Sequence, residues 1–219
     1  HQVRCIGPRI DLQVASKNRG NGMRFTIIAT AVLTSLACQM GWGADGPQSA
    51  LLEKLKSPTT EERIAAVQAL GDMGLRSAAA VPTMIKLLET DDLALRHELV
   101  MALGKINTAA EHVVPALGRA LADKDPLLQH AAVESLRMYG PDAKSALPQI
   151  LKLLASSDAF TSVNAARAIV DIDRSNDETL ARAIKVLVSG LSSNNMGIAQ
   201  ESVQGLVNLG QPAVQAVRD

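Results

Sequence analysis

Apolar and polar positions follow a pattern that returns every 33 residues from about residue 49 onward. Three kinds of residue mark it, because one leucine or isoleucine, one proline and one aspartate recur at this step. They are Leu70, Leu103, Leu136 and Ile169, then Pro82, Pro115 and Pro148, and then Asp92, Asp125 and Asp158. So many agreements at one period are typical of a repeat protein. The units run 49–81, 82–114, 115–147, 148–184 and 185–217, the fourth being about four residues longer than the others.

Each unit is predicted to form two helices, as the second unit illustrates. Met84, Ile85 and Leu87 have the spacing of a short amphipathic helix. We expect this helix to begin at or beside Pro82, since proline is well tolerated in the first helical turn. A polar break follows, in which Asp92 is well placed to accept hydrogen bonds from the free N–H groups of the next helix.

The second helix of each unit repeats an apolar face with the spacing i, i+1, i+4, which keeps the three residues on one side. The faces are Ala66, Val67 and Leu70; Leu99, Val100 and Leu103; Ala132, Val133 and Leu136; and Ala165, Ala166 and Ile169. One turn position follows each helix and is held by Gly74, Asn107, Gly140 and Asp173. Glycine or asparagine there supplies the left-handed turn that ends a helix.

The units resemble HEAT repeats, of the short variety also found in phycobilisome-lyase-like proteins. The likeness lies in segments such as EERIAAVQALGDMG, with its Arg63, Ala66 and Ala69-Leu70-Gly71, and LPQILKLLASSDAFTSVNAARAIVDI. It covers about residues 49–217 and implies an all-α fold, an α-solenoid in which about five helical hairpins over 44–219 form a right-handed superhelix. Ankyrin repeats have the same length, but their Thr-Pro-Leu-His signature is missing. Tetratricopeptide repeats would need bulky aromatic residues.

The composition narrows the class of partner. Aromatic residues make up 2% of the chain and the formal net charge is zero. Residues 48–219 carry 17 Lys and Arg against 20 Asp and Glu. Nucleic-acid binding normally needs basic phosphate contacts and often aromatic stacking platforms, so no nucleic-acid partner is expected. The sequence predicts a monomer without a cofactor that binds a protein or peptide.

A leader is predicted from Met23, where one arginine precedes an uncharged, mostly apolar stretch from Phe25 to Met40. Small residues at Gly41 and Gly43 then favour cleavage before Ala44. We therefore expect 23–43 to be a signal peptide of the bacterial type that directs the protein to the periplasm, the cell envelope or the medium. Two alternatives stay open, retention as a membrane anchor and lipidation at Cys38.

Both ends of the chain fall outside the five units. Residues 1–22 show no periodicity and are interpreted as an extension, either disordered or upstream of the true start. At the other end, Gly210, Ala213 and Val217 match the approach to a sixth unit, as Gly140 and Ala143 precede the fourth. We expect the array to continue beyond these units.

Catalytic motifs are scarce in the repeats. There is no glycine-rich phosphate loop, nucleophile elbow or Cys/His metal spacing. The string LALRHELVMALG, with His97-Glu98, resembles the His-Glu motifs of deoxyhypusine hydroxylase, a HEAT-like enzyme that holds two irons. The third unit has His130-Ala131 instead, so the pair is not repeated as an iron site requires. The sequence predicts no enzyme; the alternative is a HEAT-like enzyme, either bilin lyase-like or metal-dependent hydroxylase-like.

A binding surface is predicted along the second helices, on their concave side. Its main residues are predicted to be Gln68, His97, Met101, His130, Glu134 and Arg167, and Ile64, Val163, Gln200 and Gln204 hold equivalent positions. Such surfaces of solenoids bind proteins or peptides, so an interaction or scaffold module is predicted. His97 and His130 should be neighbours, and binding of a partner carboxylate would change between about pH 6 and 7. A solvated strip, or repeats that act only as a spacer, are the alternatives.

Overall fold

The structure is a computed structural model that describes residues 47–210. Contacts divide the chain into two units, 1–42 and 43–219, and all described helices lie in the second. The predicted leader, Cys38 and the start of a sixth unit lie outside the described residues, so those expectations stay predictions. None of the described helices has the length and apolar character needed to span a membrane.

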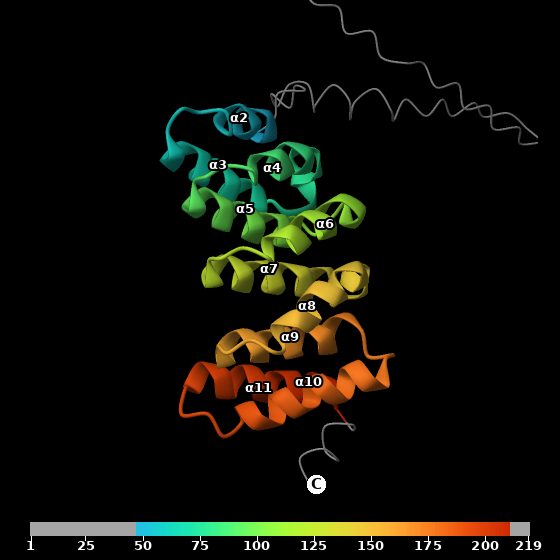
Figure 1. Cartoon of the computed structure of the whole chain (residues 1–219). Helices are drawn as coiled ribbons and strands as arrows, with labels where there is room; N and C mark the ends of the chain where they lie inside the picture. The colour runs from blue at the N-terminus through green and yellow to red at the C-terminus, as the bar shows by residue number, and fades with distance from the viewer. Residues whose placement is uncertain (1–46, 211–219) are drawn as a thin grey trace, which may run out of the picture. The chain divides into compact units, whose positions relative to one another are not determined.

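Residues 47–210 form five helical hairpins and no strand (Figure 1). The first helices are α2 (Pro47–Lys54), α4 (Val81–Leu87), α6 (Ala110–Ala120), α8 (Leu147–Leu153) and α10 (Asp177–Gly190). The second helices are α3 (Thr60–Asp72), α5 (Leu93–Ile106), α7 (Pro126–Tyr139), α9 (Ala159–Ile172) and α11 (Met196–Leu209). Two 3-10 helices, η1 (Gly74–Ala80) and η2 (Gly140–Ala146), lead into α4 and α8. Each second helix packs against the next, from α3 to α11, which confirms the all-α solenoid.

The predicted apolar faces of α3, α5, α7 and α9 are all buried, with at most 1% of any residue exposed. Small residues set the spacing between these helices. A Cβ atom on Gly71 would lie 3.0 Å from Ala102 Cβ, and one on Gly104 would lie 2.7 Å from Ser135 Oγ. The backbones therefore approach closely, and leucines fill the remaining space at the density of a protein interior.

The predicted aspartate caps are confirmed. Asp92 Oδ1 accepts a hydrogen bond from Leu95 N at 3.1 Å, and Asp158 Oδ2 accepts one from Thr161 N at 2.8 Å. Asp125 caps α7 in the same way. The pKa of Asp92 is lowered, chiefly by a hydrogen bond from the Thr60 hydroxyl in the preceding repeat. Each aspartate thus caps the start of a second helix. The cap of α5, Asp92, also forms a hydrogen bond with the preceding repeat.

Three of the four predicted turn residues have a positive φ, namely Gly74, Asn107 and Gly140 with φ of 57°, 49° and 51°. The prediction is wrong for Asp173, whose φ is −150°. The reason is the longer fourth unit, in which the chain is non-helical from Asp173 to Asn176, the residue that caps α10. The extra residues of the fourth unit therefore lie mainly in α10, which has 14 residues against 11 in α6 and 7 in α8.

The predicted helix starts are confirmed at Pro82 and Pro148, each the second residue of its helix. They are wrong for the third and fifth units. α6 begins at Ala110 and contains Pro115 in its interior, and α10 begins at Asp177, eight residues before Lys185. In the third and fifth units the first α-helix starts directly after the turn. In the second and fourth units a 3-10 helix lies between the turn and the first α-helix. Pro115 leaves the Glu111 carbonyl without its usual donor, on an exposed side of α6.

Candidate functional site

The predicted concave strip is crossed by polar pairs that join neighbouring repeats. Gln68 Nε2 donates to Glu98 Oε2 at 3.1 Å, from α3 to α5. Arg167 of α9 pairs with Glu201 of α11. Glu134 pairs with Arg137 within α7, and Arg137 Nε also lies 2.9 Å from Asp171 Oδ2 of α9. Gln68, Glu134 and Arg167 are therefore already engaged within the protein.

The remaining positions of the strip differ in exposure. Gln200 and Gln204 are exposed, and Met101 is half-buried against the core. The expectation that Val163 lies on the surface is wrong, because it is only 2% exposed. Its helix, α9, packs against α7, α8, α10 and α11, so more of its circumference is covered than one apolar face would indicate.

His130 is enclosed by the following repeat. Its ring centroid lies 4.9 Å from that of Phe160, with the two planes inclined by 40°. Asn164 Nδ2 lies 2.6 Å from His130 Nδ1 and donates to it when that nitrogen carries no proton. Phe160 and Asn164 are both residues of α9. The imidazole of His130 is therefore part of the packing contact between α7 and α9.

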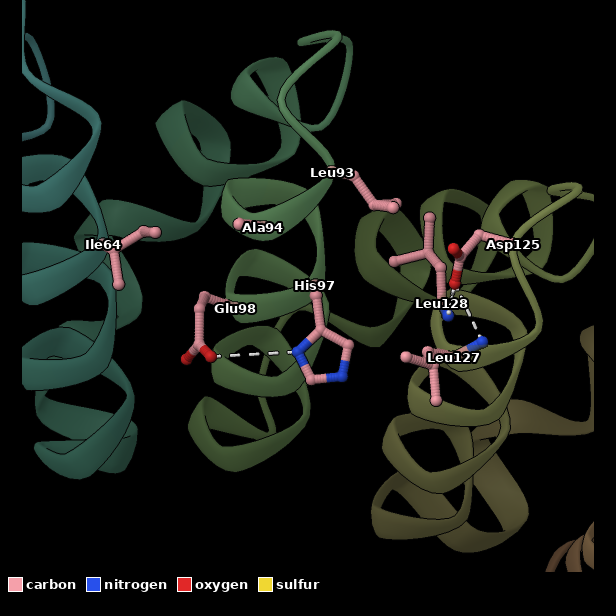
Figure 2. Close-up of a pocket in the computed structure, with 8 residues that line it drawn as sticks. All are labelled: Ile64, Leu93, Ala94, His97, Glu98, Asp125, Leu127 and Leu128. Atoms are coloured by element: carbon pink, nitrogen blue, oxygen red, sulfur yellow. Dashed lines mark hydrogen bonds and ion pairs between the residues drawn. The ribbon is translucent and has the colours of Figure 1, made fainter.

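His97 instead lines an open pocket of about 510 Å³ between α3, α5 and α7 (Figure 2). Its ring points across the gap toward α7, where Leu127 and Leu128 lie, and its Nδ1 is 3.8 Å from Glu98 Oε1. The full lining is Ile64, Leu93, Ala94, His97, Glu98, Asp125, Leu127 and Leu128. Of the six main residues of the predicted strip, His97 is the one that lines this pocket.

Two leucines at the pocket are unusually exposed for their type. Leu127 is 70% exposed and Leu93 is 43% exposed. Both lie in the first turn of a second helix, at the edge from which α5 and α7 begin. These leucines were not predicted from the sequence. Only the two strip positions of each second helix were considered, and both come after the first helical turn. The available signal was the 33-residue step from Ala94 to Leu127 and then Phe160, at the second residue of successive helices.

The charges around the pocket are negative. Nearby cations are engaged elsewhere, since Arg96 Nη2 lies 2.5 Å from Asp123 Oδ2 and Arg63 lies 3.7 Å from Asp92. The pKa of Asp123 is lowered, first by the backbone N–H of Asp125 and then by Arg96. Within residues 47–210, no lysine or arginine pairs with the two pocket carboxylates. These carboxylates belong to Glu98 and Asp125.

A metal centre is not assembled in the part of the chain that the structure describes, where no cluster of three or more His, Cys, Asp or Glu side chains could hold an ion. His97 and Glu98 lie together, but His130 contacts Phe160 and Asn164. The pair resembling an iron-binding motif is thus part of a mostly apolar pocket. The metal-dependent alternative would need ligands from outside residues 47–210.

The comparison with protein families agrees with this architecture. Residues 49–137 match the family of HEAT repeats. The family match thus covers most of the first three of the five described hairpins. The matched segment includes α3, α5 and most of α7, and so contains every residue of the pocket. A comparison with curated proteins finds no match.

Solved structures extend the likeness in fold over the whole array of hairpins. An engineered protein is 23% identical with a TM-score of 0.59, the alignment covering 78% of this chain and 84% of the other. A designed armadillo repeat protein in complex with the peptide (KR)4 is 18% identical with a TM-score of 0.56, covering 78% and 87%. The complex of CpcE and CpcF of phycocyanin lyase from Nostoc sp. PCC7120 is 20% identical with a TM-score of 0.53, covering 93% and 85%. At these identities the likeness concerns the fold alone.

Proposed function

We propose that this HEAT-repeat chain is a non-enzymatic interaction module that binds a protein or peptide along its second helices. The observation that carries the proposal is the pocket at His97. It is mostly apolar, it opens on the surface, and two exposed leucines lie at it. Exposed apolar side chains grouped at a hollow are typical of binding sites rather than of an ordinary solvated surface.

The strip beside the pocket is proposed to contribute polar contacts. Gln68 and Met101 lie on the helices that form the pocket, and Gln68 is exposed. His130, Glu134 and Arg167 continue the strip toward α9, each already engaged within the protein. The solved neighbour bound to the peptide (KR)4 supports a peptide-binding role for such a face, since its fold is similar.

Site-specific photocrosslinking tests the proposal. We would place a photoreactive phenylalanine analogue at Leu127 and, in a matched variant, at Leu75, a leucine of η1 that is 69% exposed and lies away from the pocket. In the cells that produce the protein, the expected result is a discrete crosslinked species from position 127 that is absent from position 75. No discrete species at 127, or equal yields at both positions, would contradict the proposed surface.

The enzymatic alternative has one observation behind it, the similarity in fold to a phycocyanin lyase complex. We would test it on the purified full chain by metal analysis and by the absorbance of an added bilin. The proposed function predicts neither stoichiometric iron nor a bound bilin. Iron that is lost when His97 and His130 are changed to alanine would establish the hydroxylase-like alternative, and a retained bilin would establish the lyase-like one.

Export remains part of the proposal, and it rests on the sequence from Met23 to Gly43. It includes localisation in the periplasm, envelope or medium. Fusing a reporter that is active only after export behind Asp219 tests it, with deletion of 25–40 as the control. Determining the N-terminus of the mature protein separates the alternatives, because cleavage before Ala44, lipidation at Cys38 and a retained anchor leave different ends. An inactive reporter would contradict export.

A further inference from the structure

We infer that the pocket at His97 selects a peptide segment in which one apolar side chain stands between basic residues. This inference rests on the proposed function and specifies the chemistry of the partner. Its basis is the combination of an apolar pocket with two carboxylates that lack a lysine or arginine partner in the described residues.

The apolar part of the pocket suits a single aliphatic or methionine side chain. Ile64 approaches from α3, Leu93 from the start of α5, and Leu127 from α7 (Figure 2). Burial of an apolar side chain contributes roughly 1.5–3 kcal/mol when it is complete. A volume of about 510 Å³ is at the small end of the range for ligand pockets, so it takes an anchor residue rather than a whole helix.

The carboxylates lie on different sides of this anchor site. Figure 2 shows Glu98 on the side of α5 that faces α3, and Asp125 at the beginning of α7. One oxygen of Asp125, Oδ1, accepts the N–H groups of Leu127 and Leu128. The Glu98 carboxylate accepts a hydrogen bond from Gln68 Nε2 at 3.1 Å, and its other oxygen lies 3.8 Å from Nδ1 of His97. Opposite charge favours lysine or arginine on both sides of the anchor.

The neighbouring repeats restrict this recognition to one anchor. At the equivalent place between α7 and α9, the Phe160 ring lies against His130. Between α3 and α5, the position equivalent to Leu127 is Ala94, whose short side chain lines the same pocket. Specificity therefore concentrates at one side chain of the partner and the charges next to it.

Selection from a random peptide library displayed on phage tests the inference on the full chain at neutral pH. Enriched peptides would be measured by fluorescence anisotropy against the wild type, Leu127→Ser and Glu98→Gln. Leu75→Ser and Glu178→Gln serve as matched controls, because both residues are exposed and lie outside the pocket. We expect enriched sequences with an apolar residue between lysines or arginines. Leu127→Ser should weaken them about tenfold, and Glu98→Gln about two- to fivefold, with no change in either control.

The other outcomes separate the two levels of the proposal. Enriched peptides that are acidic or lack basic residues, but that still depend on Leu127, would overturn the inferred chemistry and leave the proposed function standing. Failure to enrich any peptide, or binding that is insensitive to Leu127→Ser, would overturn both. Replacing the peptide's own basic residues by glutamine gives a check that alters nothing in the protein, and it should reproduce the loss seen with Glu98→Gln.

Discussion

His97 and His130 hold the same position in consecutive repeats, one 33-residue step apart, and yet their surroundings differ. His97 lines an open pocket and has a carboxylate, Glu98, 3.8 Å away. His130 packs against an aromatic ring and an amide of the next helix. The backbone around the two residues is equivalent, since each follows a helix start capped by aspartate.

The difference comes from two residues of the following repeat. Leu127, which faces His97, is replaced one step later by Phe160, whose ring reaches His130. Ala131 is replaced one step later by Asn164, which supplies the hydrogen-bonding amide. A repeat array can therefore keep a common core and still open or close a surface site through the side chains that face it from the next helix.

The largest expected effect comes from the spacing of α5 and α7, the two helices that carry the histidines. In Gly104→Val, the new Cβ would lie 2.9 Å from the Cα of Ser135, so backbone must move and α5 must separate from α7. We expect the free energy of unfolding to fall by about 3 kcal/mol, at the upper end for overpacked cores. Urea denaturation followed by circular dichroism measures it. The control is Gly118→Ala, where the nearest atom is 3.9 Å away and stability should hold or rise slightly.

A smaller loss is expected at the C-terminal ends of the same two helices. The Tyr139 hydroxyl donates to the Leu103 carbonyl at 3.0 Å and lies 2.9 Å from the Thr108 carbonyl, and burial raises the Tyr139 pKa to about 12. Tyr139→Phe removes this donor, so unfolding should become easier by about 1–2 kcal/mol. Because the pocket lies at the other helix ends, peptide binding should not change. Equal stability of variant and wild type would show that these hydrogen bonds contribute nothing.

A still smaller, pH-dependent effect is expected at the cap of α5. The pKa of Asp92 is lowered, chiefly by the Thr60 hydroxyl, so the folded state favours the carboxylate. The stabilisation by the Asp92 carboxylate is complete above the pKa of the unfolded state, near 3.8. It is lost as the pH falls through the lower pKa of the folded state. Asp92→Asn keeps a capping side chain, so it should lower the urea midpoint slightly at neutral pH and not at all in strong acid. A pH-independent difference would contradict this origin.

The sequence predicted the parts of this molecule that depend on local pattern. The hairpins, the buried faces from Ala66 to Ile169 and the aspartate caps all follow from helical spacing and capping chemistry. The pocket could not be predicted from this local pattern. It depends on whether a side chain of one repeat is long enough to contact the histidine of the preceding repeat. Leu127 and Phe160 are both apolar at the same step, and the pattern does not distinguish an open site from a filled one. Val163 was misplaced for a related reason, since the number of helices around α9 is a tertiary property.

The smallest effect on stability, and the most direct test of the comparison, comes from exchanging the two apolar residues. Leu127→Phe should place a ring beside His97, and Phe160→Leu should remove the ring from His130. Both positions are at least partly exposed, so each change should alter the free energy of unfolding by less than about 1 kcal/mol. Ring-current shifts of the imidazole protons, measured by NMR, should appear at His97 in the first variant and disappear from His130 in the second. The first variant should also lose peptide binding as its pocket fills. Unchanged imidazole shifts in both variants would mean that the crossing of the helices, and not the facing side chain, decides whether a repeat is open.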